Sequence, residues 1–337
     1  MRVDGGIGSD LRAAASQAQK AEGEGYDGVW SAETGHDPFL PLVIAAEHTE
    51  RLELGTGIVV AFGRNPMTVA NLGWDLNTYS EGRFLLGLGS QIKPHIEKRY
   101  SMPWSHPAPR MREFISAMRA IWDCWQNGTK LDFRGDFYSH TLMTPFFDPG
   151  PNEHGAPKVL LAAVGAGMTT VAGEVADGML VHGFTTERYL REVTLPTIEA
   201  GLASSGRRRA DFQLSYPAFV VTGDTEEQIR TAATGTRKQI AFYASTPAYR
   251  PVLELHGWGD LQVELNTLSK RGEWDEMGRR IDDAVLDAFA VTGTPEEIPG
   301  LLNQRFGDLV DRISLYMPGG SGGHDVAPRI LAGLKQI

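Results

Sequence analysis

Two side chains near the start of the chain have the chemical types that proton transfer uses. Glu33 and His36 stand in the stretch SAETGHD, directly after an apolar run that is typical of a β-strand. A carboxylate or an imidazole becomes a general acid or base when its surroundings bring its pKa near the working pH. We therefore take both residues as acid–base candidates, with His95, which follows GLGSQ at 87–91, as a third. The alternative for Glu33 is a carboxylate that accepts hydrogen bonds from loop amides or caps the next helix.

A run of small residues, AAVGAGMTT at 162–170, has the composition of an anion-binding turn. Val164, Gly165 and Ala166 would leave backbone N–H groups unshielded at the start of a helix, where the helix dipole also favours negative charge. The alternative is a tight turn that needs glycine for its geometry alone. His182 ends the next strand candidate, so it is predicted to face the same region and either to contact a ligand or to bond a loop.

The histidines also raise the question of a metal. His36, Asp37, His95 and His182 would supply suitable nitrogen and oxygen ligands if they converged. The sequence contains neither HxH nor HExxH, spacings that are typical of zinc sites. We therefore expect no metal site.

A third feature is the stretch LGTGIVVAFG at 54–63, a β-branched apolar run interrupted by Gly55 and Gly57. A glycine inside a strand costs about 0.5–1 kcal/mol, because it loses more backbone freedom and packs no side chain. Interior glycines are typical of a bulge or of a place where another group approaches the backbone closely. The stretch therefore predicts that something lies against this strand.

These candidates all follow short apolar runs that alternate with helical patterns. The expected strands lie at 2–5, 27–33, 52–62, 83–89, 158–164, 178–183, 212–222 and 311–317. The expected helices lie at 10–24, 39–50, 66–80, 109–127, 168–176, 187–204, 225–243, 295–306 and 326–335. Strands and helices in alternation predict an α/β fold, a (β/α)8 TIM barrel that forms a single domain over 1–337. Insertions at roughly 92–157, with a hairpin in FRGDFYSH, and 244–290 are expected over the C-terminal ends of the strands.

A doubly wound open sheet is the rival architecture. Its phosphate-binding signature GxGxxG is absent, because GGIG at 5–8 has the wrong spacing. In a TIM barrel the C-terminal ends of the strands carry the chemistry. The acid–base candidates and the small-residue turn all stand at such ends, so the barrel is predicted to bring them together.

Composition narrows the partners and the location. The formal net charge is −10, which opposes binding to nucleic acid or to an anionic membrane. The one cysteine, Cys124, cannot form an internal disulfide, and no run approaches 18 apolar residues. We expect a soluble, cytoplasmic protein that binds a small molecule.

Three segments carry a resemblance to a known family: LGTGIVVAFGRNP at 54–66, SEGRFLLGLG at 80–89 and VLLAAVGAGMTTVAGEVADGMLVHG at 159–183. With them, nearly the whole chain resembles the luciferase-like monooxygenase superfamily, in particular its coenzyme F420-dependent (deazaflavin) oxidoreductases. The resemblance implies a bulge with a non-proline cis peptide behind the cofactor ring, and the matching bond is Gly57–Ile58, followed by Val59. It also implies that the amides of 164–166 hold the cofactor phosphate, with His182 nearby.

The same resemblance assigns further residues. Ser90, Gln91 and His95 fall where the family lines the ring pocket, and Glu33 falls where an aspartate often contacts the ring. Thr34 stands at the position of the usual acid–base histidine, and His36 is the nearest substitute. Ile92 stands near the position of the glutamate that sugar-phosphate dehydrogenases of this group use, so a sugar phosphate is not the expected substrate.

The resemblance implies an oxidoreductase that transfers a hydride between coenzyme F420 and a small organic substrate. One alternative is an FMN-dependent two-component monooxygenase of the same fold, and another is a non-catalytic flavin-binding protein. Aromatic residues of the insertions are candidates for an apolar substrate pocket or for packing: Trp104, Tyr243, Trp258 and Trp274. A homodimer is expected, with the helices at 39–46 and 67–79 in contact.

Overall fold

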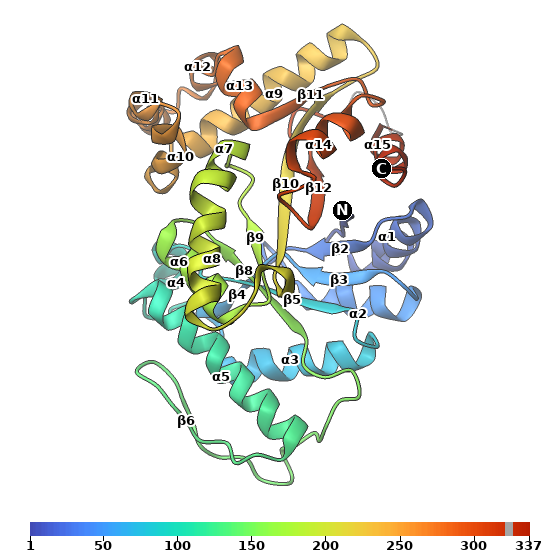
Figure 1. The fold of residues 1–337 in the computed structure, drawn as a ribbon, viewed down its shortest axis with the longest axis vertical. Helices are drawn as coiled ribbons and strands as arrows, with labels where there is room; N and C mark the ends of the chain where they lie inside the picture. Colours follow the sequence, from blue (N-terminus) through green and yellow to red (C-terminus); the bar gives the residue numbers. More distant parts are fainter. Residues whose placement is uncertain (321–325) are drawn as a thin grey trace.

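A closed barrel of eight parallel strands forms the centre of the molecule in the computed structural model, which describes residues 1–320 and 326–337. Its strands are β1 (Arg2–Gly6), β2 (Gly28–Ser31), β3 (Glu53–Thr56), β5 (Phe84–Gly89), β8 (Lys158–Ala163), β9 (Gly178–Val181), β10 (Gln213–Thr222) and β12 (Arg312–Tyr316). They pair in this order, and β12 pairs with β1 to close the ring. The predicted TIM barrel is confirmed (Figure 1).

Helices connect the strands and cover the outside of the barrel, and a last helix follows β12. They are α1 (Leu11–Glu24), α2 (Phe39–His48), α3 (Pro66–Tyr79), α5 (Pro107–Asn127), α6 (Ala166–Val175), α8 (Leu195–Ser204), α9 (Glu226–Ala244), α14 (Ile298–Phe306) and α15 (Val326–Leu334). Local chemistry explains several boundaries: Asp10 caps α1, and Asn65 forms a capping box before Pro66. Thr225 caps α9 by accepting a hydrogen bond from the Gln228 amide. The predicted helix at 187–204 is divided into α7 (Glu187–Tyr189), a π-helical turn (Leu190–Thr194) and α8.

The expected third strand at 52–62 is broken in the middle. After β3 the chain resumes as the short strand β4 (Val59–Val60), followed by a 3₁₀ turn (Ala61–Gly63). The Gly57–Ile58 peptide between β3 and β4 is cis, as the resemblance implied. Both β3 and β4 pair with β5, so the interruption is a bulge within one ladder.

The two insertions differ in structure. The first contains α5 and a hairpin of β6 (Phe133–Arg134) and β7 (Ser139–His140), as the sequence predicted, and also α4 (Lys93–Lys98), which was not predicted. The second contains a 3₁₀ turn (Pro247–Tyr249), α10 (Arg250–Leu255), α11 (Gly259–Lys270), α12 (Trp274–Arg279) and α13 (Asp283–Phe289). Strand β11 (Ala290–Gly293), which was not predicted, follows it and pairs with β10. The hairpin and helices α10–α12 lie toward opposite ends of the long axis in Figure 1.

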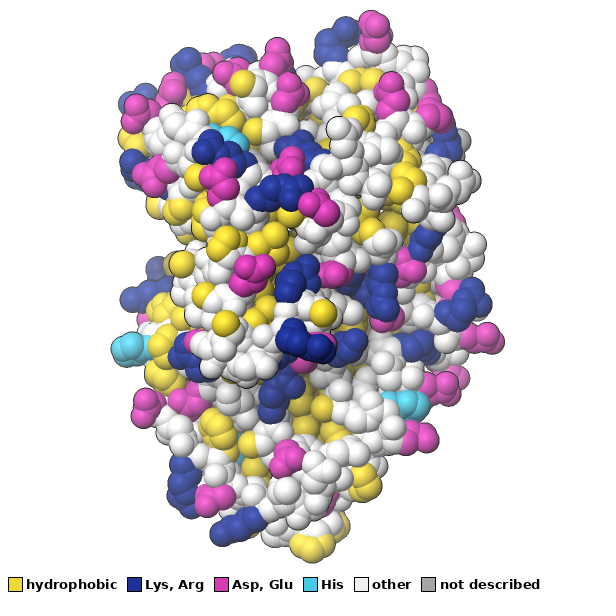
Figure 2. Space-filling view, viewed as in Figure 1, with side chains coloured by type: hydrophobic (Ala, Val, Ile, Leu, Met, Phe, Trp, Pro, Cys, Tyr) yellow, Lys and Arg dark blue, Asp and Glu magenta, His cyan; other side chains and the backbone are white. Residues whose placement is uncertain are grey.

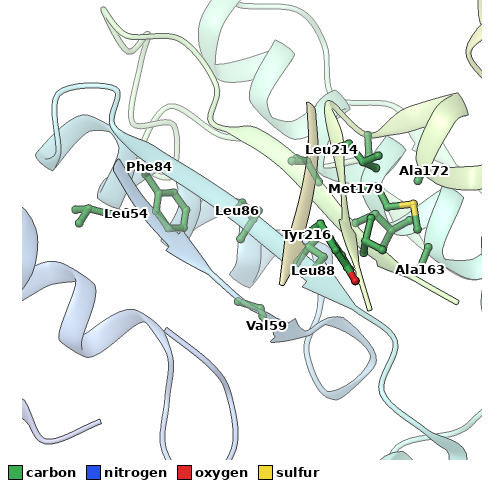
Figure 3. Close-up of a cluster of buried hydrophobic side chains, with 14 of the residues drawn as sticks. Leu54, Val59, Phe84, Leu86, Leu88, Ala163, Ala172, Met179, Leu214 and Tyr216 are labelled. Atoms are coloured by element: carbon green, nitrogen blue, oxygen red, sulfur yellow. The ribbon is translucent and has the colours of Figure 1, made fainter. Parts of the chain in front are cut away.

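The apolar residues form two clusters. The larger one fills the space between the strands and helices around the barrel, and Figure 3 shows part of it, including Leu86, Met179 and Tyr216. The smaller one packs Phe184 and Phe219 of the barrel against α9–α13, which we call the cap. Single-residue exposures within both clusters are close to zero, so each is a well-packed core.

The surface carries mixed charge. On the face shown in Figure 2, basic and acidic side chains are interspersed rather than separated into patches. Within the described residues, no helix combines the length and the apolar character needed to span a bilayer.

Candidate functional site

Partly exposed side chains indicate a hollow at the C-terminal mouth of the barrel. The Trp30 indole donates a hydrogen bond to Asp4, and Asp4 forms an ion pair with Arg312. These three side chains therefore point into the barrel. Alternation along β12 then turns Ser314 and Tyr316 inward as well. Trp30 and Ser314 keep partial exposure although they lie on strands that helices cover from outside. A barrel filled by its own side chains would bury them, so the mouth has room for a ligand.

The floor of this hollow is a charged and aromatic layer. The Trp30 indole donates to Asp4 Oδ2 at 2.9 Å, and Arg312, fully buried, donates to the same carboxylate at 2.8 Å. A Cβ added at Gly55 would lie 2.3 Å from the indole. The indole of Trp30 is therefore the group that requires glycine at position 55. At Gly57 the nearest atom would be an ordinary 3.5 Å away.

Glu33 braces the bulge at 57–60. Its amide donates to the Ile58 carbonyl at 3.2 Å, and its Oε2 accepts from the Val60 amide at 2.8 Å. Its Oε1 accepts from the Tyr100 hydroxyl at 2.9 Å and lies 3.3 Å from Arg64. The Glu33 side chain is 7% exposed. Both carboxylate oxygens are thus occupied, which corresponds to the loop-binding alternative considered for this residue.

The other two acid–base candidates lie at the surface. His36 and His95 are exposed, and within the described residues neither imidazole has a hydrogen bond or ion pair. The segment between them is held by other groups: Asp37 pairs with Arg64 at 2.8 Å, and Arg99 donates to the Thr34 carbonyl. The structure therefore does not join His36 or His95 to Glu33.

The loop after β5 lies beside the bulge. Val60 is opposite Gly89 in the β4–β5 ladder, so Ser90 and Gln91 continue next to it. Gln91 has a left-handed backbone with φ 60°, and its side chain accepts from the Ile92 amide. Both residues keep partial exposure at the rim of the hollow.

The small-residue turn at 163–167 has the features of an anion site. Gly165 has φ 77° and ψ 156°, a conformation that suits glycine, and it precedes α6 without any side-chain cap. Residues 164–167 are exposed, so the first N–H groups of α6 face open space. Thr185, only 4% exposed, lines the same cleft, and its hydroxyl has no hydrogen-bond partner in the described part of the chain. An unpaired buried hydroxyl next to a free helix N-terminus is an arrangement that a bound oxyanion completes.

His182 lies in this cleft as a neutral group. Its Nδ1 accepts from the Phe184 amide at 3.0 Å, so its Nε2 carries the proton and donates to the Tyr249 hydroxyl at 3.1 Å. The two rings are stacked at 4.6 Å. Burial lowers the pKa of His182 to about 4 and raises the pKa of Tyr249 to about 12. The Tyr249 proton is left free for a third group.

Most of the chain matches a known protein family: residues 2–312 fit the family model described as luciferase-like monooxygenase. The chain belongs to the luciferase-like monooxygenase family.

Several known proteins are similar to this chain in sequence or in structure. An uncharacterized protein of Mycobacterium tuberculosis is 58% identical over 93% of this chain and 92% of its own. The 5,10-methylenetetrahydromethanopterin reductase of Archaeoglobus fulgidus is 27% identical over 84% and 83%. A solved structure, the coenzyme F420-dependent tetrahydromethanopterin reductase of Methanopyrus kandleri, superposes with a TM-score of 0.78 at 21% identity and covers 99% and 98% of the two chains.

Some features of this luciferase-like site were not predicted. Thr185 and Tyr249 carry no motif, and only the fold brings the cap to the end of β9. Of the insertion aromatics, Tyr243 lies beside His182 with ring centroids 4.8 Å apart. The tryptophans pack elsewhere: Trp104 on Phe62, Trp258 on His256, and Trp274 near Phe242. Among the described residues, no three His, Cys, Asp or Glu side chains form a group that could bind a metal.

Proposed function

We propose that this protein is an F420-dependent oxidoreductase that transfers a hydride between the deazaflavin and a small organic substrate. The family supports this proposal, and so does the likeness to the F420-dependent reductase of Methanopyrus kandleri. A ring placed in the hollow mouth would rest against Ile58 of the bulge, above the Trp30 floor. Its phosphate would reach the free N-terminus of α6.

The residues present fit such a cofactor. The unpaired Thr185 hydroxyl and the uncapped first turn of α6 are donors that await an acceptor. Gly89 leaves room for the Ile58 side chain, because a Cβ at position 89 would lie 2.8 Å from it. Bound there, a reduced deazaflavin supplies a hydride. The bulge, which Glu33 holds in place, would orient the ring. It would also exclude water from the face of the ring that lies against Ile58.

The cleft that contains Gly165, His182 and Thr185, which we call the anion cleft, favours F420 over FMN because of its charge. Among the described residues that line it, none is Lys, Arg, Asp or Glu. Its donors are backbone amides and neutral hydroxyls, and His182 is kept neutral by burial, which lowers its pKa to about 4. The phosphodiester of F420 carries one negative charge, whereas a phosphomonoester such as that of FMN carries roughly 1.5 to 2 at pH 7. A neutral donor set suits the diester better, because nothing there balances a second charge.

The test is a pair of titrations of the purified protein, with F420 and with FMN, followed by quenching of tryptophan fluorescence. We expect saturable quenching by F420 and clearly weaker binding of FMN. A Trp30→Phe variant should lose part of the quenching while it still binds. Tighter binding of FMN than of F420 would overturn the proposed cofactor.

The family description keeps the FMN-dependent monooxygenase as the second candidate. Such an enzyme consumes oxygen when reduced FMN and an aldehyde are supplied, whereas the proposed oxidoreductase does not need oxygen. An oxygen electrode distinguishes the two. Cofactor binding without turnover of any carbonyl, imine or enone would correspond to the non-catalytic alternative.

We also propose that the protein is a homodimer that pairs through α2 and α3. These adjacent helices expose Leu40, Val43, Leu72 and Tyr79, at 53%, 43%, 37% and 51%. Large apolar side chains exposed on two adjacent helices suit an interaction surface. An interface of two such patches would cover them in a symmetric contact.

A further inference from the structure

The proposed reaction needs a proton as well as a hydride, and the expected donors are engaged elsewhere. Glu33 is occupied by three donors, and His182 uses both ring nitrogens. His36 and His95 lie exposed at the surface. Thr34 stands where a histidine was expected, and Asp4 is paired with Arg312 in the floor. The proton donor must be sought on another part of the mouth.

A pair of tyrosines lies at the mouth beside the last strand. The hydroxyl oxygens of Tyr316 and Tyr243 are 3.1 Å apart, so one of them donates to the other. Tyr316 ends β12 at an inward position, four residues beyond Arg312, which fixes the inner face of that strand. Both side chains keep partial exposure. When Tyr243 donates to Tyr316, the Tyr316 proton is free for a third group.

The rings of the pair are held firmly. Tyr316 packs on Phe219 with centroids 4.8 Å apart, and a Cβ at Gly183 would lie 3.5 Å from its ring. Tyr243 contacts the His182 ring edge-on at 4.8 Å. The hydroxyl of Tyr316 is therefore placed by packing on the strand side and by Tyr243 on the cap side, which is the preorganisation that a proton donor requires.

We propose that Tyr316 is the catalytic proton donor, that Tyr243 positions and reloads it, and that the substrate is a neutral ketone or aldehyde. This proposal rests on the function proposed above. In the reduction, the π bond of the C=O group breaks, the carbon gains the hydride of the reduced deazaflavin, and the oxygen takes the Tyr316 proton. The tyrosinate regains a proton from Tyr243, which is reloaded from water. The product is the alcohol, and the reverse reaction oxidises it.

The substrate class follows from the surroundings of the pair. Burial raises the pKa of Tyr316, and the bond with Tyr243 raises it further. A hydroxyl of this kind stays protonated at neutral pH and gives its proton readily only to a strong base such as an alkoxide. Among the described residues, the aromatic side chains next to the pair, His182, Tyr243 and Phe219, are uncharged and would not balance a charged substrate.

The experiment uses protein loaded with oxidised F420 and cyclohexanone labelled with ¹³C at its carbonyl as the probe. Infrared difference spectra report hydrogen bonding to the carbonyl as a lower C=O stretching frequency. We expect the lowered frequency in the unaltered protein and in Tyr243→Phe, and its loss in Tyr316→Phe. Tyr216→Phe is the matched control, since Tyr216 faces away from the barrel interior onto Phe306 and its hydroxyl has no partner. F420 affinity is measured for every variant.

The outcomes separate the two proposals. If the unaltered protein does not bind F420, the proposed function fails. If F420 binds and the probe shows no lowered frequency, the carbonyl class is wrong. If the frequency is equally low in Tyr316→Phe, Tyr316 is not the donor. With any ketone that is turned over, Tyr316→Phe should slow single-turnover reduction about 10²–10⁴-fold at unchanged F420 affinity. Tyr243→Phe should slow it less and should change the solvent deuterium isotope effect.

Discussion

The carboxylate of Glu33 accepts a hydrogen bond from the amide of Val60 at 2.8 Å, and thereby ties the end of β2 to the far side of the bulge. The Glu33 amide holds the near side through the Ile58 carbonyl. Tyr100 and Arg64 bond the other carboxylate oxygen, so the first insertion is fastened to the same point. One side chain thus fixes the shape of the wall on which a cofactor ring would rest.

Replacement of Glu33 by alanine should therefore affect both stability and cofactor binding. The change leaves the Val60 amide unpaired and Arg64 with Asp37 alone, and we expect a loss of about 2–4 kcal/mol in the free energy of unfolding. Glu33→Gln keeps one acceptor and should lose less. Urea denaturation and F420 titration measure the two effects, with Glu199→Ala on exposed α8 as the control. Unchanged F420 affinity in Glu33→Ala would show that the brace does not shape the ring site.

Thr185 offers a test of the anion cleft. Thr185→Val removes a hydroxyl that has no partner, so the stability of the free protein should be unchanged or slightly higher. F420 affinity should fall about tenfold, which corresponds to one hydrogen bond to an anion, about 1.4 kcal/mol. Thr222→Val is the matched control, because that buried hydroxyl is also unpaired but lies outside the cleft. Equal F420 affinities of the two variants would place the phosphate elsewhere.

His182 should make stability depend on pH. Its pKa is lowered to about 4 by burial, from 6.5, so the folded state resists protonation. Well above pH 6.5 the imidazole is neutral in both the folded and the unfolded state. As pH falls through 6.5 toward 4, the unfolded state binds the proton first, and the free energy of unfolding drops. At pH 5 the loss is about 2 kcal/mol relative to pH 7. Denaturation of His182→Gln at both pH values should show a smaller drop, whereas Thr222→Val, which removes no titratable group, should behave like the unaltered protein. Identical pH dependence in His182→Gln would contradict this assignment.

The proposed dimer contact through the exposed apolar residues of α2 and α3 can be tested by introducing a charge there. Leu40→Glu places a carboxylate in the centre of the proposed interface, where it would be desolvated without a partner. Sedimentation velocity should show the unaltered protein as a dimer and Leu40→Glu as a monomer. Leu142→Glu, at a side chain that is 76% exposed on the loop after β7, is the control and should remain dimeric. A monomeric unaltered protein at micromolar concentration would refute the proposed dimer.

Periodicity and composition were sufficient for the barrel, because each strand is a short buried apolar run with turn residues at its ends. They were also sufficient for the small-residue turn, since the glycine at 165 adopts a positive φ that few other residues tolerate. Strand β11 was missed because its ladder partner is the far end of β10, a pairing between distant segments that local pattern does not encode.

The contacts that individual side chains make could not be predicted from the sequence. Glu33 stood at the predicted place, but its four contacts come from 58, 60, 64 and 100, so its occupancy depends on the folded bulge. Gly55 was expected to mark a bulge or a close approach by another group; the group that lies there is the Trp30 indole of the neighbouring strand, which the sequence did not indicate. Tyr243 and Tyr249 reach the mouth only because the cap packs on Phe184.

The smaller apolar cluster joins the cap to the barrel, and this has a consequence for how molecules enter and leave. His182 and Tyr316 lie at the ends of β9 and β12, whereas their partners Tyr249 and Tyr243 lie in the second insertion and in α9. The three tyrosines all pack against the smaller cluster. A breathing motion that lifts the cap from the barrel breaks both contacts in one event, and local openings of this kind need less free energy than global unfolding. Binding of the cofactor beside His182 and access of the substrate to the Tyr316 hydroxyl would then depend on the same opening. Both sites would be open to water together and closed to it together.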